Sequence, residues 1–230
     1  TARISIIIFF LLPVSGTVFY FVGYDSVTLF LIALGLYFHR NILILLLIGT
    51  ALGMQHFELA FVGIGVLLFA LLIDKLAGNK EDFSIIFPLV LIIGVILGKI
   101  LLILIFNYHD IVLQASRADW YQKSLPQILY TFFFRFYNII WFSIGLGWIV
   151  IIKYYYSNSK KFTFFISFLG LLFLLPILPD TTRTFSVLSF LLIAVFLLTN
   201  EKFLTSISKK ESSIIMLLWA LIPYGWVWEG

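Results

Sequence analysis

Long apolar runs separated by short polar clusters constrain this chain more than any other feature. A helix needs about 20 apolar residues to cross the hydrocarbon core of a bilayer, and runs near that length recur from one end of the sequence to the other. The chain is 62% hydrophobic and 11% charged, whereas a soluble domain is roughly 45–50% apolar and about 25% charged. The sequence therefore predicts an all-α, polytopic integral membrane helical bundle.

The apolar runs predict about nine membrane helices in a single transmembrane domain that covers residues 1–230. They cover residues 4–22, 27–38, 41–54, 59–73, 84–106, 125–152, 162–178, 184–199 and 213–228. The second and third are short, and we expect them either to be tilted or to form a short outward hairpin around Arg40 that does not cross fully. The mixed residues 107–124 fit either a helix in the outer interface or a plain loop. Because the chain begins at Thr1 and ends without a polar tail, we expect a piece of a longer protein.

Basic residues indicate the orientation, because Lys and Arg favour cytoplasmic loops. With the N-terminus in the cytoplasm, ten of the 15 Lys and Arg residues lie on the inner side and three lie on the outer side. The inner residues are Arg3, Arg40, Lys75, Lys80, Lys153, Lys160, Lys161, Lys202, Lys209 and Lys210. The outer residues are Arg117, Lys123 and Arg183. This asymmetry predicts a cytoplasmic N-terminus.

The composition excludes several classes of function. No segment is long and polar enough to fold as a separate soluble domain, which argues against cytosolic enzymes and secreted scaffolds. The formal net charge is +4, but the basic residues are scattered between apolar runs and form no continuous patch for nucleic acid. The chain has no cysteine, which excludes disulfides, thiolate metal ligands and cysteine nucleophiles.

Polar residues at the predicted outer helix ends are the candidates for a functional site. Because their connections are short, their charged side chains must lie near the level of the lipid headgroups. We expect the carboxylates among them to converge around one outward cavity. These candidates are Asp25, Gln55, His56, Glu58, Asp180 and Arg183.

Each candidate also has a purely structural interpretation. Asp25 precedes a helix, where an Asp caps the first turn by accepting backbone N–H bonds. Glu58 lies within one turn of His56, a spacing that fits a polar cap, a general base or, with His56, a weak metal pattern. Asp180 suits a helix cap, and Arg183 either pairs with Asp180 or holds a phosphate or sugar hydroxyls with its planar fork.

Two basic residues, Lys99 and Arg135, lie inside predicted membrane helices. A basic residue there costs about 2.5–3.5 kcal/mol on insertion scales unless it snorkels or pairs. At 1.5 Å per residue, both lie about 10–15 Å below the outer surface. They fit either snorkelling to the interface or an electropositive cavity for an anionic lipid head, in which case both face the protein interior.

Three short motifs of the chain resemble those of multi-pass bacterial glycosyltransferases of the C superfamily and related polysaccharide polymerases. The third is similar to a recurring Asp-x-x-Arg element in such membrane proteins. The motifs are Gly23-Tyr24-Asp25-Ser26, Gly53-Met54-Gln55-His56-Phe57-Glu58 and Asp180-Thr181-Thr182-Arg183-Thr184-Phe185. The resemblance implies an all-helical enzyme of the bacterial inner membrane whose site faces outward and takes a sugar from a polyprenyl phosphate or diphosphate carrier. The family usually places a catalytic acid in a first large outer loop; this sequence lacks that loop, so either Asp25 takes the role or the loop precedes Thr1.

The residues offer both groups that such chemistry requires, a carboxylate to deprotonate the acceptor hydroxyl and cations to stabilise the leaving phosphate. The expected partners are a lipid-linked sugar donor and membrane lipids, and a divalent metal at His56 stays an open alternative. Two other interpretations remain open, a solute transporter or channel and a structural subunit of a membrane complex. The assigned roles are Asp25 or Glu58 as base, His56 as orienting residue or metal ligand, and Lys99, Arg135, Asp180 and Arg183 as substrate-binding residues.

Overall fold

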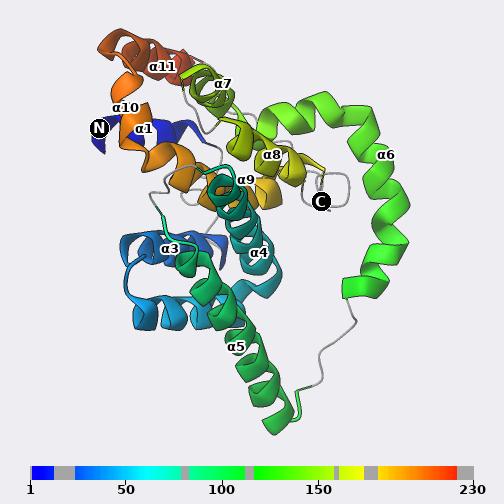
Figure 1. Cartoon of the computed structure of the whole chain (residues 1–230). Helices are drawn as coiled ribbons and strands as arrows, with labels where there is room; N and C mark the ends of the chain where they lie inside the picture. The colour runs from blue at the N-terminus through cyan, green and yellow to red at the C-terminus, as the bar shows by residue number, and fades with distance from the viewer. Residues whose placement is uncertain are drawn as a thin grey trace.

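The computed structural model describes residues 2–12, 24–78, 83–111, 117–157, 161–173 and 181–221, and every regular element in these ranges is a helix (Figure 1). The predicted all-α fold is therefore confirmed. The described helices are α1 (Ala2–Leu11), α3 (Tyr24–Tyr37), α4 (Ile42–Leu76), α5 (Ile86–Tyr108), α6 (Arg117–Ile144), α7 (Gly147–Ser157), α8 (Lys161–Leu172), α9 (Thr181–Ile193), η2 (Ala194–Leu198), α10 (Glu201–Ser206) and α11 (Lys209–Leu221).

Among the described helices, two are long and apolar enough to cross a membrane, α4 and α5. The prediction of nine membrane helices is not supported, because several predicted runs are divided by turns or form shorter helices. The run predicted at 125–152, for example, is divided between α6 and α7. Gly145 lies in the intervening turn with φ 57°, a left-handed backbone that glycine adopts without steric cost.

Helix α3 and the first segment of α4 form the short hairpin that the sequence predicted. Helix α3 is followed by a turn at residues 38–40, and Asn41 then caps α4 by accepting a 3.2 Å hydrogen bond from the backbone N–H of Ile44. Helix α4 breaks at His56, where φ is −147° and ψ is 66°. The break lies between the helices predicted at 41–54 and 59–73, and the two segments of α4 run in different directions in Figure 1.

Glycines bring α4 and α5 into backbone contact. A methyl group added at Gly49 would lie 2.6 Å from the carbonyl oxygen of Leu91, and one added at Gly94 would lie 2.6 Å from that of Leu46. One turn further along each helix, methyl groups at Gly53 and Gly98 would overlap the carbonyl oxygens of Val95 and Thr50. Both helices therefore carry a Gly-x-x-x-Gly pair, the pattern that lets membrane helices approach closely.

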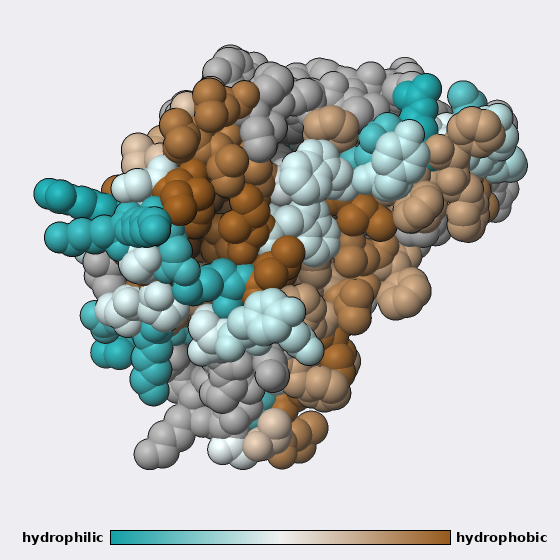
Figure 2. Space-filling model, turned by 90° about the horizontal axis from the view of Figure 1, so that it is seen from above, coloured by the Kyte–Doolittle hydropathy of each residue, from teal (hydrophilic) through white to brown (hydrophobic). Residues whose placement is uncertain are grey.

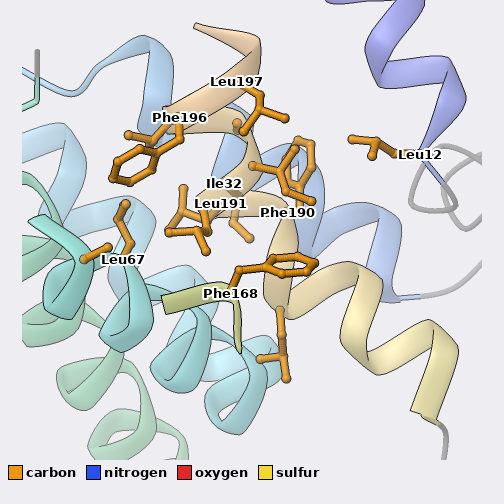
Figure 3. Packing of buried hydrophobic residues seen from close by; sticks show 14 of the residues in the cluster. Leu12, Ile32, Leu67, Phe168, Phe190, Leu191, Phe196 and Leu197 are labelled. Atoms are coloured by element: carbon orange, nitrogen blue, oxygen red, sulfur yellow. The ribbon is translucent and has the colours of Figure 1, made fainter. Parts of the chain in front are cut away.

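The core is built around α9 and the π-helix that continues it. Every residue from 185 to 197 is buried, as expected of a helix that is apolar on nearly all faces. Figure 3 shows Phe190, Leu191, Phe196 and Leu197 of this helix among buried side chains from other elements. Helix α9 contacts α3, α4, α6 and α8, so it joins the parts of the fold that are far apart in sequence.

Helices near the two ends of the described chain meet at η2. The side chain of Ser5 in α1 donates a 2.7 Å hydrogen bond to the carbonyl of Leu198, at the end of the π-helix. A π-helix shifts the backbone pairing by one residue, and this bond gives a carbonyl at its end a partner. Helix α1 also contacts α11, which places residues from both ends of the chain on one side of the molecule (Figure 1).

Apolar side chains remain exposed over much of the surface (Figure 2). Only 22% of the most apolar 18-residue stretch of α5 is buried. Burial in a soluble core therefore does not account for the apolar composition of this helix. Its exposed residues include Ile93, Ile96, Leu97, Ile100, Leu101, Ile103, Leu104 and Ile105.

Candidate functional site

An acid–base pair lies where α3 begins and α4 breaks. The Nε2 atom of His56 is 4.0 Å from Oδ1 of Asp25, and the two side chains are 10% and 4% exposed. This separation is longer than a direct hydrogen bond, but catalytic contacts are often long before substrate binds. The hairpin explains the meeting, because the start of α3 and the end of the first segment of α4 lie on the same side of it.

A cation approaches the same break from α5. The ammonium of Lys99 lies 5.5 Å from the centre of the Phe57 ring, a distance at which the ring face attracts a cation. Phe57 directly follows His56, and consecutive Cα atoms are about 3.8 Å apart. The carboxylate from α3 therefore lies beside the residue at the break, and the ammonium from α5 lies over the ring of the residue that follows it.

The glycine contacts between α4 and α5 place Lys99 there. Gly98 precedes it in sequence and packs on the backbone at Thr50 and Met54, within one to two turns of Phe57. Lys99 is only partly exposed. Its contact with the protein here is an aromatic ring, and the expectation that Lys99 meets an anionic headgroup, a phosphate or a paired carboxylate stays a prediction.

An apolar groove begins one turn beyond the site. The Phe57 ring stacks on that of Phe61, with centroids 5.5 Å apart and planes 23° apart. Phe61 is the first residue of a cavity of about 330 Å³ between the second segment of α4 and α8. The cavity has open space above Gly65 and Gly170, where an added methyl group would meet no atom within 4 Å. Its lining residues are Phe61, Val62, Gly65, Val66, Phe69, Ser167 and Gly170.

The other predicted site residues do not join this cluster in the described part of the chain. Glu58 follows the break by two residues but is exposed. Arg135 is also exposed, which corrects the expectation that it faces the protein interior. Its helix, α6, packs on α9 and α7 and arcs away from α5 in Figure 1. The convergence of Asp25, Glu58 and Asp180 stays a prediction, because Asp180 lies outside the described residues; Arg183 lies in the first turn of α9.

Sequence reasoning missed a second buried acid. Asp74, near the end of α4, is 1% exposed and accepts a 3.3 Å hydrogen bond from the hydroxyl of Thr163 in α8. The only sequence signal was an acidic residue at the end of an apolar run, and such a residue equally suits a solvated loop. The contact ties α4 to α8 next to the groove that these helices form.

The described residues contain no group of three or more His, Asp or Glu side chains that could hold a metal ion. At the break, Asp25 is the ligand type that lies 4.0 Å from His56. Searches of protein-family models, curated proteins and solved structures find no match to this chain. The function is therefore argued from the geometry of the break in α4.

Proposed function

We propose that this chain is an integral membrane glycosyltransferase or polysaccharide polymerase that acts on polyprenyl-phosphate-linked sugars at the outer face of a bacterial inner membrane. The observation that supports it most is the buried Asp25 carboxylate beside the His56 imidazole at a helix break, with the Lys99 ammonium over the ring of the next residue, Phe57. These are the base, its orienting partner and the phosphate ligand that the reaction requires.

The membrane location is supported by the apolar surface of the molecule. Helix α5 has 23 residues, a length of about 35 Å at 1.5 Å per residue, and it exposes aliphatic side chains along its length. Water would not solvate such a surface, whereas the hydrocarbon core of a bilayer does. The excess of basic residues in the predicted inner loops supports a cytoplasmic N-terminus.

In the proposed reaction, the Asp25–His56 pair removes the proton from a hydroxyl of the acceptor sugar. The hydroxyl oxygen then bonds to the anomeric carbon of the donor, and the bond from that carbon to the phosphate oxygen breaks. The leaving polyprenyl phosphate or diphosphate gains negative charge, which Lys99 stabilises. The burial of Asp25 strengthens this arrangement, because an electrostatic interaction at a given distance is stronger where water is excluded.

The groove that begins at Phe61 seats the first part of the polyprenyl chain in this proposal. Stacked Phe57 and Phe61 connect the ammonium to the groove without a polar gap. From Phe61 to Phe69 the groove follows eight residues of helix, about 12 Å. A ligand with a phosphate head and a long isoprenoid tail matches this arrangement, in which a cation is followed by an apolar groove.

The experiment uses the full chain reconstituted in lipid nanodiscs with labelled lipid-linked sugars prepared from bacterial membranes. Release of the polyprenyl phosphate carrier in the presence of acceptor saccharides reports transfer. Asp25→Asn and His56→Gln should each lower the rate about 100-fold or more, since general-base catalysis contributes roughly 10²–10⁴-fold. His109→Gln, which changes an exposed histidine at the end of α5, is the matched control and should keep the wild-type rate.

A second test concerns the groove alone. Gly65→Trp fills open space and should weaken binding of a long-chain polyprenyl phosphate at least tenfold, while Gly65→Ala should bind as wild type does. The proposal is wrong if the wild-type chain releases no carrier from any of these donors, or if Asp25→Asn turns over normally.

The break in α4 also favours a second candidate, a solute transporter. Discontinuous membrane helices often form the solute site of transporters, and His56 interrupts the longest apolar helix among the described residues. The two candidates differ in a simple measurement. A transporter moves labelled sugar or ions across proteoliposomes without releasing a lipid carrier, whereas the transferase releases the carrier without net flux.

A further inference from the structure

Four exposed cations lie on the elements that meet at the ends of the described chain. They belong to three helices that are distant in sequence, and α1 contacts both α11 and η2, which α10 directly follows. Figure 2 shows hydrophilic side chains gathered toward the side where Figure 1 places these helices. These cations, here called the basic platform, are Arg3 of α1, Lys202 of α10, and Lys209 and Lys210 of α11.

The nearby acid of α11 does not neutralise the basic platform. Glu211 is bound by Lys153 of α7 at 2.5 Å and by the backbone N–H of Ser208 at 2.8 Å. The Lys153 ammonium and the Ser208 hydrogen bonds lower the pKa of Glu211 to about 2. Glu201 is the other acidic residue on α10 and α11, so the platform carries a net positive charge.

The two lysines of α11 are not explained by the stability of that helix. They occupy its first turn, where the helix dipole disfavours positive charge. Ser208 and Glu211 already cap the helix reciprocally, because the N–H of Glu211 also donates to the Ser208 hydroxyl at 3.2 Å. The lysines therefore point to an interaction outside the helix.

An apolar surface follows the lysines along α11. Four side chains after the first turn are 47–67% exposed, and they are Ile214, Met216, Leu217 and Leu221. The described helix has 13 residues, about 20 Å, which is shorter than the hydrocarbon core. The order of charge followed by exposed apolar surface fits a helix that starts at the level of lipid phosphates and ends in the acyl chains.

We infer that the basic platform binds the headgroups of anionic phospholipids, with α11 entering the same leaflet beside them. A soluble acidic protein would match the charge but not the adjoining aliphatic side chains, so lipid is the partner that fits both. The inference rests on the membrane location of the proposed function and not on glycosyl transfer. In the predicted orientation, all four cations face the cytoplasmic leaflet, whose anionic lipids attract such clusters.

The test is lipid retention by the full chain, purified in micelles that contain equal amounts of phosphatidylglycerol and phosphatidylcholine. Native mass spectrometry counts the lipids that stay bound. The wild-type chain should retain phosphatidylglycerol at least tenfold more than phosphatidylcholine, because each lysine near an anionic surface contributes about a fivefold preference. The preference should fall to about fivefold or less in the triple variant Lys202→Gln/Lys209→Gln/Lys210→Gln, in which Arg3 alone remains of the basic platform.

The control variant Arg40→Gln/Lys75→Gln removes two exposed cations that lie apart, in the α3–α4 turn and at the end of α4, and it should lower the preference less than the triple variant does. Should the triple variant not fold, the single variants replace it, each with a partial loss. Equal retention of the two lipids by the wild type, or an unchanged preference in the variants, overturns the inference. A chain that does not enter lipid at all instead overturns the membrane location on which both proposals depend.

Discussion

Helices α5 and α6 each carry one basic residue within a stretch predicted to cross the membrane, yet the structure places these residues differently. Lys99 of α5 is partly buried and lies over the Phe57 ring. Arg135 of α6 is exposed, at a point where φ is −125° and ψ is 18° and the helix departs from α geometry. Hydropathy alone indicated a similar depth for both side chains, and it left snorkelling and an inward position open for each.

The difference follows from the small residues of the two helices. Gly94 and Gly98 let α5 lie against the backbone of α4. Residues 126–142 of α6 contain no glycine or alanine and are rich in aromatic side chains, which keep a neighbouring backbone at a distance. Close packing therefore decides which basic residue reaches the break in α4, and the spacing of small residues predicts that packing better than hydropathy does.

Separating α4 from α5 should lower the stability of the protein more than any of the other substitutions below. Gly53→Leu or Gly98→Leu would force a side chain into a backbone carbonyl of the facing helix, and backbone cannot yield as a side chain can. We expect a loss of about 3 kcal/mol or more in stability, measured by thermal unfolding and by the yield of monodisperse protein in detergent.

Gly170→Leu is the control for these variants. It adds the same side chain to a helical glycine of α8 that has open space around it, so its stability should stay within about 0.5 kcal/mol of wild type. Equal stability of Gly98→Leu and Gly170→Leu would mean that the glycine contacts do not hold α4 and α5 together.

Neutralising the two basic residues separates their roles directly. Lys99→Gln should weaken binding of polyprenyl phosphate at least tenfold, because it removes the cation that lies over the Phe57 ring, next to the break in α4. Arg135→Gln should change binding by less than about twofold, as expected for an exposed charge away from the site. Fluorescence titration with a labelled long-chain polyprenyl phosphate measures both.

The opposite result would be equally informative. If Arg135→Gln lowers affinity as much as Lys99→Gln does, the headgroup is bound from the side of α6, and the sequence prediction of two phosphate partners is restored. If neither variant lowers affinity, no anionic headgroup is bound at the break.

Much of the fold could be predicted from hydrophobic periodicity, and the failures have physical causes. The all-helical class, the short hairpin around Arg40 and the interruption near His56 all follow from apolar runs and short polar clusters. The start of α11 at Lys209 was missed by four residues, although Ser208 and Glu211 have the spacing of a capping box. The turn at Gly145 was missed because a single glycine in an apolar run does not by itself indicate a left-handed backbone.

The site was predicted in part. The meeting of Asp25 with His56 follows from the outer ends of a hairpin, which its length and orientation indicate. The contact of Lys99 with Phe57 depends on the rotation of α5 about its axis, and the register of the glycines sets that rotation. Apolar runs carry no information on rotation when a helix is apolar on every face.

The turn between α6 and α7 depends on a left-handed backbone at Gly145, and changing this residue should have a smaller effect on stability. Gly145→Ala places a Cβ atom in a left-handed conformation and should cost about 1–2 kcal/mol, which lowers the melting temperature by roughly 2–8 °C for a chain of this size. Gly145→Asn should recover much of the loss, since asparagine tolerates this conformation. If alanine and asparagine behave alike, the left-handed turn is not what joins the two helices.

The contact between α7 and α11 should have the smallest effect on stability. An exposed ion pair joins these two helices, whereas glycine packing joins α4 and α5. The pKa of Glu211 is lowered from 4.5 to about 2 by Lys153 and Ser208, so the contribution of the carboxylate is fully present above pH 4.5 and is lost as the pH falls toward 2. The chain has no cysteine, and Tyr156→Cys with Ile214→Cys would allow spin labels on exposed positions of the two helices. We expect the distribution of distances between the two spin labels to broaden as the pH falls through this acid range, while the α4–α5 contact stays unchanged. Glu211→Gln should give the broad distribution at every pH. If that variant shows the same acid transition, a different group titrates, and the Lys153–Glu211 pair does not hold α11 in place.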